Sequence, residues 1–201
     1  MGPSTRRCPP AHAGDNMRWW LAFLVLVPLL FILVPGNRPA GRECVVVNAL
    51  GYDGHSGRVI PLEFCAVPGD GTVYLDSRSV YGRDFQVAVA TAREVFRRRN
   101  GGQGRDVLVR VHGAPEYFDG RSVALAVYAG IFSVLFGYDV SDYAFTGDLS
   151  PDGTVLPVSY IDEKASAFEG NVVVPLGSCR EGLICVSDVS ELEDIIASKR
   201  V

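Results

Sequence analysis

The sequence has few of the features that bind metals or nucleotides. It contains three histidines and five cysteines among 201 residues, with no C-x-x-C, no H-x-x-x-H and no acid–histidine cluster. A zinc site and metal-dependent hydrolysis therefore lack ligands. Neither a P-loop nor a G-x-G-x-x-G motif occurs, so nucleotide binding has no support. We expect a protein that uses no metal and no cofactor.

An excess of charge of one sign is also lacking. The chain has 19 basic and 23 acidic residues, which gives a net charge of −4. This balance does not indicate a nucleic-acid-binding protein, and we expect no nucleic-acid partner. The basic cluster Arg97–Arg99 ends a stretch from Gly82 to Asn100 in which apolar residues recur at helical spacing. It either binds phosphate or complements the negative end of that helix.

The cysteines leave two interpretations open. Cys44 and Cys65 fall on two neighbouring strand-like segments, whereas Cys179 and Cys185 flank the short segment "REGLI". Both pairs are compatible with disulfides if the domain lies outside the cytoplasm. Buried free thiols are the alternative for each pair.

One long apolar run lies near the N-terminus. The segment from Trp19 to Pro35 carries no charge, and a helix of this length reaches roughly 25 Å, within the range of membrane spans. We predict a disordered tail at 1–18, a single transmembrane anchor in the lipid bilayer at 19–35 and a linker at 36–42. A cleaved signal peptide is the alternative, although no A-x-A site follows. Met17 is a second candidate start.

Residues 43–201 show the pattern of an α+β domain. More arginines precede the apolar run than follow it, which favours an extracytoplasmic position for this domain. Alternating or β-branched segments predict short strands at 43–50, 57–67, 71–76, 106–113, 142–161, 171–177 and 182–188. Helical spacing predicts helices at 82–100, 122–138 and 162–170, and a last helix that Ser190 caps.

The helix predicted at 122–138 has no charged residue on any face. Such a helix is buried either in a protein core or in a membrane. Its glycine, serine and small residues favour a central helix packed between sheets. Asp119 and Ser122 stand at its N-terminal end, where serine and aspartate often cap a first turn.

Serine and lysine are the remaining candidates for chemistry. A serine hydroxyl becomes a nucleophile only when a base takes its proton. Lys164 could be that base for Ser122 if burial lowers its pKa from about 10.4. His112 is a second candidate partner for Ser122, although a lone histidine near a strand end is more often structural.

The order of three motifs favours the serine–lysine pair. The sequence "DGRS" at 119–122 is followed by "TGDLSPDGTVLPV" at 146–158 and by Lys164. This order resembles the proteolytic domain of the Lon protease family, in which a D-G-x-S motif opens a central helix. A T-G-[DE] strand, a G-x-V-L-P-[IV] strand and a lysine-bearing helix follow there. The resemblance runs from Val45 to the C-terminus and is most specific in its middle third.

The resemblance implies a compact fold of short strands around a central buried helix, and roles for four residues. Ser122 corresponds to the nucleophile and Lys164 to the general base of a Ser-Lys dyad. Thr146 corresponds to the threonine beside the lysine, and Asp119 to the acid before the serine. Because the family assembles rings, a homo-oligomer is also implied.

The sequence departs from the family pattern at several positions. Arg121, Val123 and Ala124 replace the frequent proline, alanine and glycine around the serine, and Ser159 and Tyr160 stand where two glycines often precede the lysine helix. Larger side chains here are expected to narrow the cleft or alter the oxyanion donors. The ATP-driven unfolding module of Lon proteases has no counterpart in these 201 residues.

The sequence therefore predicts a membrane-anchored serine endopeptidase of Lon type. Its expected substrates are unfolded or exposed peptides, hydrolysed without ATP. One alternative is a binding module that keeps the fold and lacks activity. The other is a peptidase subunit that works with a separate unfoldase.

Overall fold

The structure is a computed structural model that describes residues 43–113 and 117–198. The predicted tail at 1–18, anchor at 19–35 and linker at 36–42 lie outside these described residues. Within 43–113 and 117–198, no helix is both long and apolar enough to span a bilayer. The described part is an α+β domain, as the sequence predicts.

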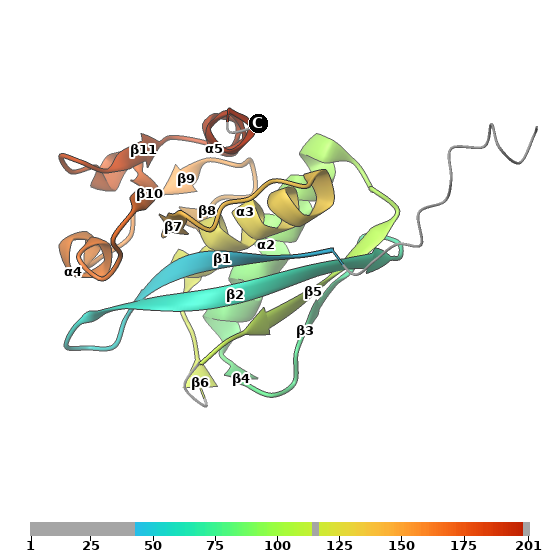
Figure 1. Ribbon diagram of the computed structural model, residues 1–201, viewed down its shortest axis with the longest axis horizontal. Coiled ribbons are helices and arrows are strands. Elements are labelled where there is room, and N and C mark those ends of the chain that lie inside the picture. Colours follow the sequence, from blue (N-terminus) through green and yellow to red (C-terminus); the bar gives the residue numbers. More distant parts are fainter. Residues whose placement is uncertain (1–42, 114–116, 199–201) are drawn as a thin grey trace, which may run out of the picture. The chain divides into compact units, whose positions relative to one another are not determined.

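A mixed seven-stranded sheet, with the order β11-β10-β7-β1-β2-β5-β3, forms the framework of the domain (Figure 1). At its centre β2 pairs antiparallel with both β1 and β5, and the outer strands add parallel neighbours. The strands are β1 (Glu43–Tyr52), β2 (Gly57–Pro68), β3 (Val73–Leu75), β5 (Arg105–Val111), β7 (Tyr143–Phe145), β10 (Asn171–Pro175) and β11 (Ile184–Val186). Two small pairs complete the described strands: β4 (Val80–Tyr81) with β6 (Tyr117–Phe118), and β8 (Asp148–Leu149) with β9 (Val155–Leu156).

Two helices, α2 (Arg83–Asn100) and α3 (Ala124–Phe136), lie on the same face of the sheet (Figure 1). Every residue of α3 from Ala124 to Val134 is buried, and the helix contacts β1, β2, α2 and α5 (Val189–Ala197). The core interpretation of 122–138 is therefore confirmed, although α3 packs on one sheet and the neighbouring helices rather than between two large sheets. Burial on every side explains why no position of this helix carries a charge.

The helix ends differ from the sequence prediction at one cap. Asp188, not Ser190, is the N-cap of α5, because its carboxylate accepts hydrogen bonds from the N–H groups of Ser190 and Glu191 at 2.7 and 3.2 Å. Serine and aspartate both suit an N-cap by residue type, and here one oxygen of the Asp188 carboxylate accepts both bonds.

The arginines at the end of α2 form ion pairs within the domain. Arg97 and Arg98 pair with Glu94 at 2.9 and 2.7 Å, and Arg99 pairs with Glu193 of α5 at 3.1 Å. The cluster thus complements both the helix end and nearby carboxylates. This arrangement favours the helix-end explanation over a phosphate site.

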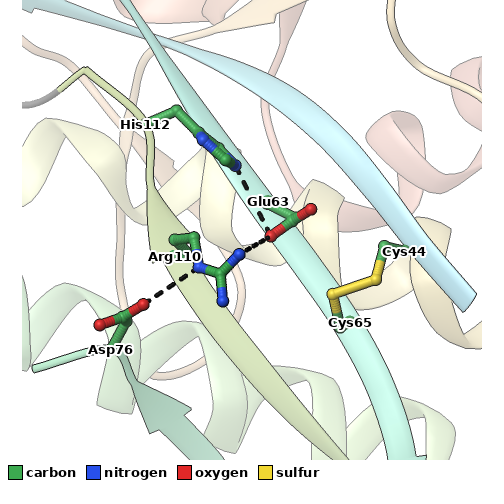
Figure 2. Close-up of a disulfide and its surroundings, with 6 residues drawn as sticks. All are labelled: Cys44, Glu63, Cys65, Asp76, Arg110 and His112. Atoms are coloured by element: carbon green, nitrogen blue, oxygen red, sulfur yellow. Dashed lines mark hydrogen bonds and ion pairs between the residues drawn. A yellow bond between two sulfur atoms is a disulfide. The ribbon is translucent and has the colours of Figure 1, made fainter. Parts of the chain in front are cut away.

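Four cysteines are joined in two disulfides. Cys44 and Cys65 are cross-strand partners on β1 and β2, and Cys179 and Cys185 close a short loop between η2 (Leu176–Ser178) and β11. Figure 2 shows the first of these beside Glu63 on the outer face of the sheet. The two sulfur atoms and a Glu63 oxygen lie within 4.8 Å of one another. Because both sulfurs are in the disulfide, this group offers no thiolates for a metal.

The β1–β2 hairpin extends beyond its neighbours at one end. β7 pairs with β1 only at Asn48 and Ala49, and β5 meets β2 only from Leu62 onward. The hairpin end, residues 50–61, therefore projects past both neighbouring strands. The carboxylate of Asp53 holds its turn by accepting hydrogen bonds from two backbone N–H groups at 2.8 and 2.9 Å. This projecting end forms one side of the site described next.

Candidate active site

A cavity of about 1060 Å³ opens beside the hairpin end. Its walls come from β1, β2, β6, the segment that carries Ser122 and the helix that carries Lys164. Both predicted site residues, Ser122 and Lys164, line this one cavity. Its lining is Ala49, Leu50, Gly51, Tyr52, Asp53, Gly57, Arg58, Val59, Ile60, His112, Gly113, Tyr117, Phe118, Asp119, Gly120, Ser122, Val123, Tyr160, Lys164 and Ala167.

Ser122 lies in a single 3-10 turn, η1 (Arg121–Val123), directly before α3. The turn is possible because Gly120 adopts a φ of 119°, a conformation that side-chain-bearing residues rarely adopt. No side chain caps either η1 or α3. The capping explanation for Ser122 is therefore wrong, and its hydroxyl is not used to hold a helix end.

The segment after α3 fixes the backbone of Ser122. Its carbonyl oxygen accepts a hydrogen bond from the Gly147 N–H at 2.8 Å and one from the Thr146 hydroxyl at 3.5 Å. The Leu125 N–H in turn donates to the Gly147 carbonyl at 3.0 Å. Thr146 is fully buried, so these bonds are protected from water. The described hydrogen bond of the Thr146 hydroxyl is thus with the serine backbone.

Asp119 caps a different helix from the one that follows it. Its carboxylate accepts hydrogen bonds from the Phe85 N–H in the first turn of α2 at 3.0 Å, from the Tyr117 hydroxyl at 2.9 Å and from the Gly120 N–H at 2.9 Å. These bonds lower the pKa of Asp119, and the bond from the Phe85 N–H has the largest effect. The expectation that Asp119 caps its own helix is wrong, because the chain turns at Gly120 and directs the carboxylate toward α2.

Lys164 belongs to a short helix, α4 (Ile161–Ala165). The residue is 5% exposed although it lines the cavity. Burial in these surroundings lowers the pKa of the Lys164 ammonium, because the charged form loses its hydration. The Lys164 amine therefore becomes neutral at a lower pH than the amine of a solvated lysine does. A general base requires this neutral form.

The hairpin end holds the backbone of α4. A Cβ atom built at Gly57 would lie 1.9 Å from the Glu163 carbonyl oxygen and 2.8 Å from the Lys164 Cα. Only glycine permits so close an approach between β2 and the helix. Sequence reasoning missed Gly57, because a glycine in a turn-rich stretch gives no sign of what will pack against it.

The arginine of the "DGRS" motif points out of the cavity. Arg121 donates to the Asp148 carboxylate at 2.7 Å, and it is not among the residues that line the cavity. Its large side chain therefore does not narrow the cleft, contrary to expectation. Tyr160, the second departure, does line the cavity and stacks on Tyr52.

His112 lines the cavity, but its described partner is Glu63. The imidazole Nε2 lies 3.6 Å from a Glu63 oxygen, and Arg110 bridges the same carboxylate to Asp76 at 3.1 and 3.0 Å (Figure 2). This row of charges runs along the outer face of the sheet. The geometry therefore ties His112 to the sheet surface and gives the serine–histidine hypothesis no support.

Comparison with protein-family models finds no match. Curated proteins do match. The chain is 30% identical over 159 residues to Lon protease 2 of Sorangium cellulosum, which covers 75% of this chain and 19% of that protein. It is 30% identical over 165 residues to the Lon protease of Paraburkholderia phytofirmans, a match that covers 77% of this chain and 19% of that protein. It is 28% identical over 158 residues to the Lon protease of Escherichia coli K12, and this match covers 74% of this chain and 19% of that protein.

The first step is the class of protein: an α+β domain with one cavity that holds a serine and a buried lysine. The similarity to three Lon proteases then specifies it: the chain carries a Lon protease-related domain. The chain spans about a fifth of the length of the curated relatives it matches, as the 19% coverage states.

Proposed function

We propose that the domain is a serine endopeptidase with Ser122 as nucleophile and Lys164 as general base. The observation that carries the proposal is the presence of both side chains in one cavity, with the lysine 5% exposed and its pKa lowered by burial. Similarity to proteins named Lon protease supports the same reaction class.

The proposed reaction uses the neutral form of the lysine. Lys164 accepts the hydroxyl proton of Ser122 as the oxygen attacks the peptide carbonyl, and an acyl-enzyme forms. The resulting ammonium then gives its proton to the leaving amine. Water, deprotonated by the same lysine, releases the acyl group. Backbone N–H groups of η1 are the candidate donors for the oxyanion.

Two further residues support this arrangement. We assign Thr146 to positioning, because its hydroxyl holds the carbonyl of the nucleophile; orientation of Lys164 by the same threonine remains a prediction. Asp119 anchors the turn before Ser122 to the N-terminus of α2. Substrates on this proposal are unfolded or exposed peptides, and we expect their cleavage to need no ATP.

The decisive experiment measures cleavage of an unstructured, fluorogenic peptide by the purified chain without nucleotide. Ser122→Ala and Lys164→Ala should each lower turnover at least about a thousandfold, and the double variant should be no worse than either, because the two groups act as a unit. Ser77→Ala, at an exposed turn serine, is the matched control. Wild-type turnover in either dyad variant, with the control unaffected, would contradict the assignment.

Two alternatives of different class are separated by the same assay. An inactive binding module would bind the peptide without cleaving it; Tyr160, in place of the usual glycine at the cavity, favours this reading. A subunit that borrows an unfoldase would also cleave the peptide, and it would cleave a folded protein only when that unfoldase is added; the much longer relatives favour that reading. Cleavage of peptide alone supports the peptidase proposal over the binding module.

We also propose that residues 19–35 anchor the domain in a membrane and that the domain faces the extracytoplasmic side. The uncharged run supports the anchor, and the two disulfides support an oxidising compartment. The protein should stay in the membrane fraction after carbonate washing, and protease added to intact cells should digest the domain. A domain protected until lysis, with alkylatable thiols at these cysteines, would place it on the cytoplasmic side. The family resemblance further supports assembly into a homo-oligomer, which sedimentation would test.

A further inference from the structure

The cavity wall beside Lys164 is aromatic. Tyr52 ends β1 and Tyr160 directly precedes α4, and both line the cavity. Their ring centroids lie 4.2 Å apart and their planes differ by 12°, so the rings are stacked. Tyr160 is nevertheless 54% exposed. We call these two residues the tyrosine pair. Tyr160 thus lines the cavity and stays largely exposed although its ring is stacked.

The tyrosine pair exists at a conformational cost. Tyr160 has φ 62° and ψ 40°, and in residues 43–113 and 117–198 it is the one non-glycine residue with positive φ. A glycine would adopt this conformation without strain. A side chain at this position therefore costs backbone free energy, and such strain gathers at functional sites.

The pair is also held in place before any ligand arrives. Gly57, the cross-strand partner of Tyr52, packs directly on the backbone of α4. The Lys164 N–H donates to the Tyr160 carbonyl at 3.0 Å. These contacts join the tyrosine pair to the hairpin end and to α4. A rigid aromatic surface of this kind loses little conformational entropy when a ligand binds to it.

Three charged groups at the cavity, Asp53, Arg58 and Asp119, already have partners. Arg58 forms an ion pair with Asp53 at the hairpin end, and Asp119 accepts three hydrogen bonds. A charged substrate side chain that approached these groups would compete with their present partners. A flat apolar side chain would lose nothing and could stack on the exposed ring of Tyr160.

We propose that the tyrosine pair binds an aromatic side chain of the substrate close to the scissile bond and so sets the cleavage preference. This inference rests on the proposed function, because the pair acts next to Lys164. Tyr160 is on this view a specificity-determining residue and not a catalytic one. Its ring provides the contact, while its backbone carbonyl belongs to the support of α4.

The experiment compares short blocked peptides that differ at one position, which carries Phe, Leu, Ala, Asp or Lys in an otherwise Ala/Ser sequence. Wild-type kcat/KM should favour the Phe peptide over the Ala peptide about tenfold or more, with Asp and Lys lowest. Mass spectrometry should find cleavage adjacent to the Phe. Tyr160→Gly, which suits the positive φ, should reduce the Phe/Ala ratio to about threefold or less, whereas Tyr160→Phe should keep it. Tyr74→Ala removes a similarly exposed tyrosine (50%) from β3 and should change nothing.

Binding measured with the Ser122→Ala variant separates this proposal from the peptidase proposal. Even if the dyad assignment fails, the Ser122→Ala variant should bind the Phe peptide more tightly than the Ala peptide. Adding Tyr160→Gly to this variant should reduce that preference by the factor expected for kcat/KM. A wild-type protein that cleaves or binds all five peptides equally would overturn the tyrosine-pair proposal. So would a Tyr160→Gly variant that keeps the full Phe preference.

Discussion

The two sides of the cavity are built in different ways. Ser122 is attached to α3, which the core surrounds and which buries every residue from Ala124 to Val134. Lys164 is on the five-residue α4, where the buried residues are Ile161 and Lys164. The core fixes the serine side, whereas the lysine side depends on a few contacts at the edge of the domain. We therefore expect that a packing change on the lysine side lowers activity without unfolding the domain, whereas a packing change beneath the serine acts mainly through stability.

The contact between Gly57 and α4 provides the strongest test. Gly57→Ala places a methyl group 1.9 Å from the Glu163 carbonyl oxygen, so α4 must shift. Because a displacement of about 1 Å can cost about a hundredfold in rate, we expect kcat/KM for an unstructured peptide to fall by about that factor. Thermal unfolding should change by only a few degrees. Gly102→Ala, where a methyl group meets open space, is the control. Unchanged kcat/KM in Gly57→Ala would show that α4 tolerates displacement.

A glycine on α3 tests the opposite expectation. Gly130→Ala directs a methyl group to 2.2 Å from the ring of Phe64 in the core. Overpacking of this kind costs about 1–3 kcal/mol, partly offset by the better helix propensity of alanine. Urea unfolding should therefore show a loss of about 1–2 kcal/mol, and the folded fraction should keep kcat/KM within about twofold. Loss of activity at full stability would contradict the idea that the core controls the serine side through folding.

The pH dependence tests which side titrates. Burial lowers the pKa of Lys164 from its ordinary value of 10.5, so the neutral, active fraction grows as pH rises toward and through the lowered pKa. Below that pKa, log kcat/KM should rise about one unit per pH unit and then level off. A profile that falls above neutral pH would instead implicate a group active in its protonated form. The Gly102→Ala variant should reproduce the wild-type profile.

The smallest effect is expected from the exposed ion pair on the lysine side. Arg180 lies 3.5 Å from Asp162 at the start of α4, and both side chains are largely exposed, at 56% and 76%. Exposed pairs contribute about 0–1 kcal/mol and are screened by salt. Arg180→Ala should change kcat/KM by no more than about twofold. A loss near that of Gly57→Ala would show that α4 is held by charge and not by close packing.

The sequence predicted much of the fold because its local signals are strong. The helix at 82–100 has apolar residues at regular helical spacing, and the uncharged segment after Ser122 had to be buried. Both were found in place, as α2 and α3. The predicted N-cap of α5 was wrong. Ser190 and Asp188 are equally good caps by residue type, and only the backbone geometry selects between them.

The sequence by itself determined which residues are candidates, since "DGRS", the "TGD" segment and Lys164 occur in a recognisable order. It could not determine what Asp119 and Arg121 contact, because Phe85 and Asp148 reach them only through folding. The tertiary structure also decided that Tyr52, Gly57 and Tyr160 belong to the cavity. Tyr52 and Gly57 face each other across one hairpin, whereas Tyr160 comes from a distant part of the chain, and their meeting depends on the antiparallel register of β1 and β2 and on where α4 packs. Local sequence encodes propensity and burial, whereas the contacts that shape a site depend on long-range packing.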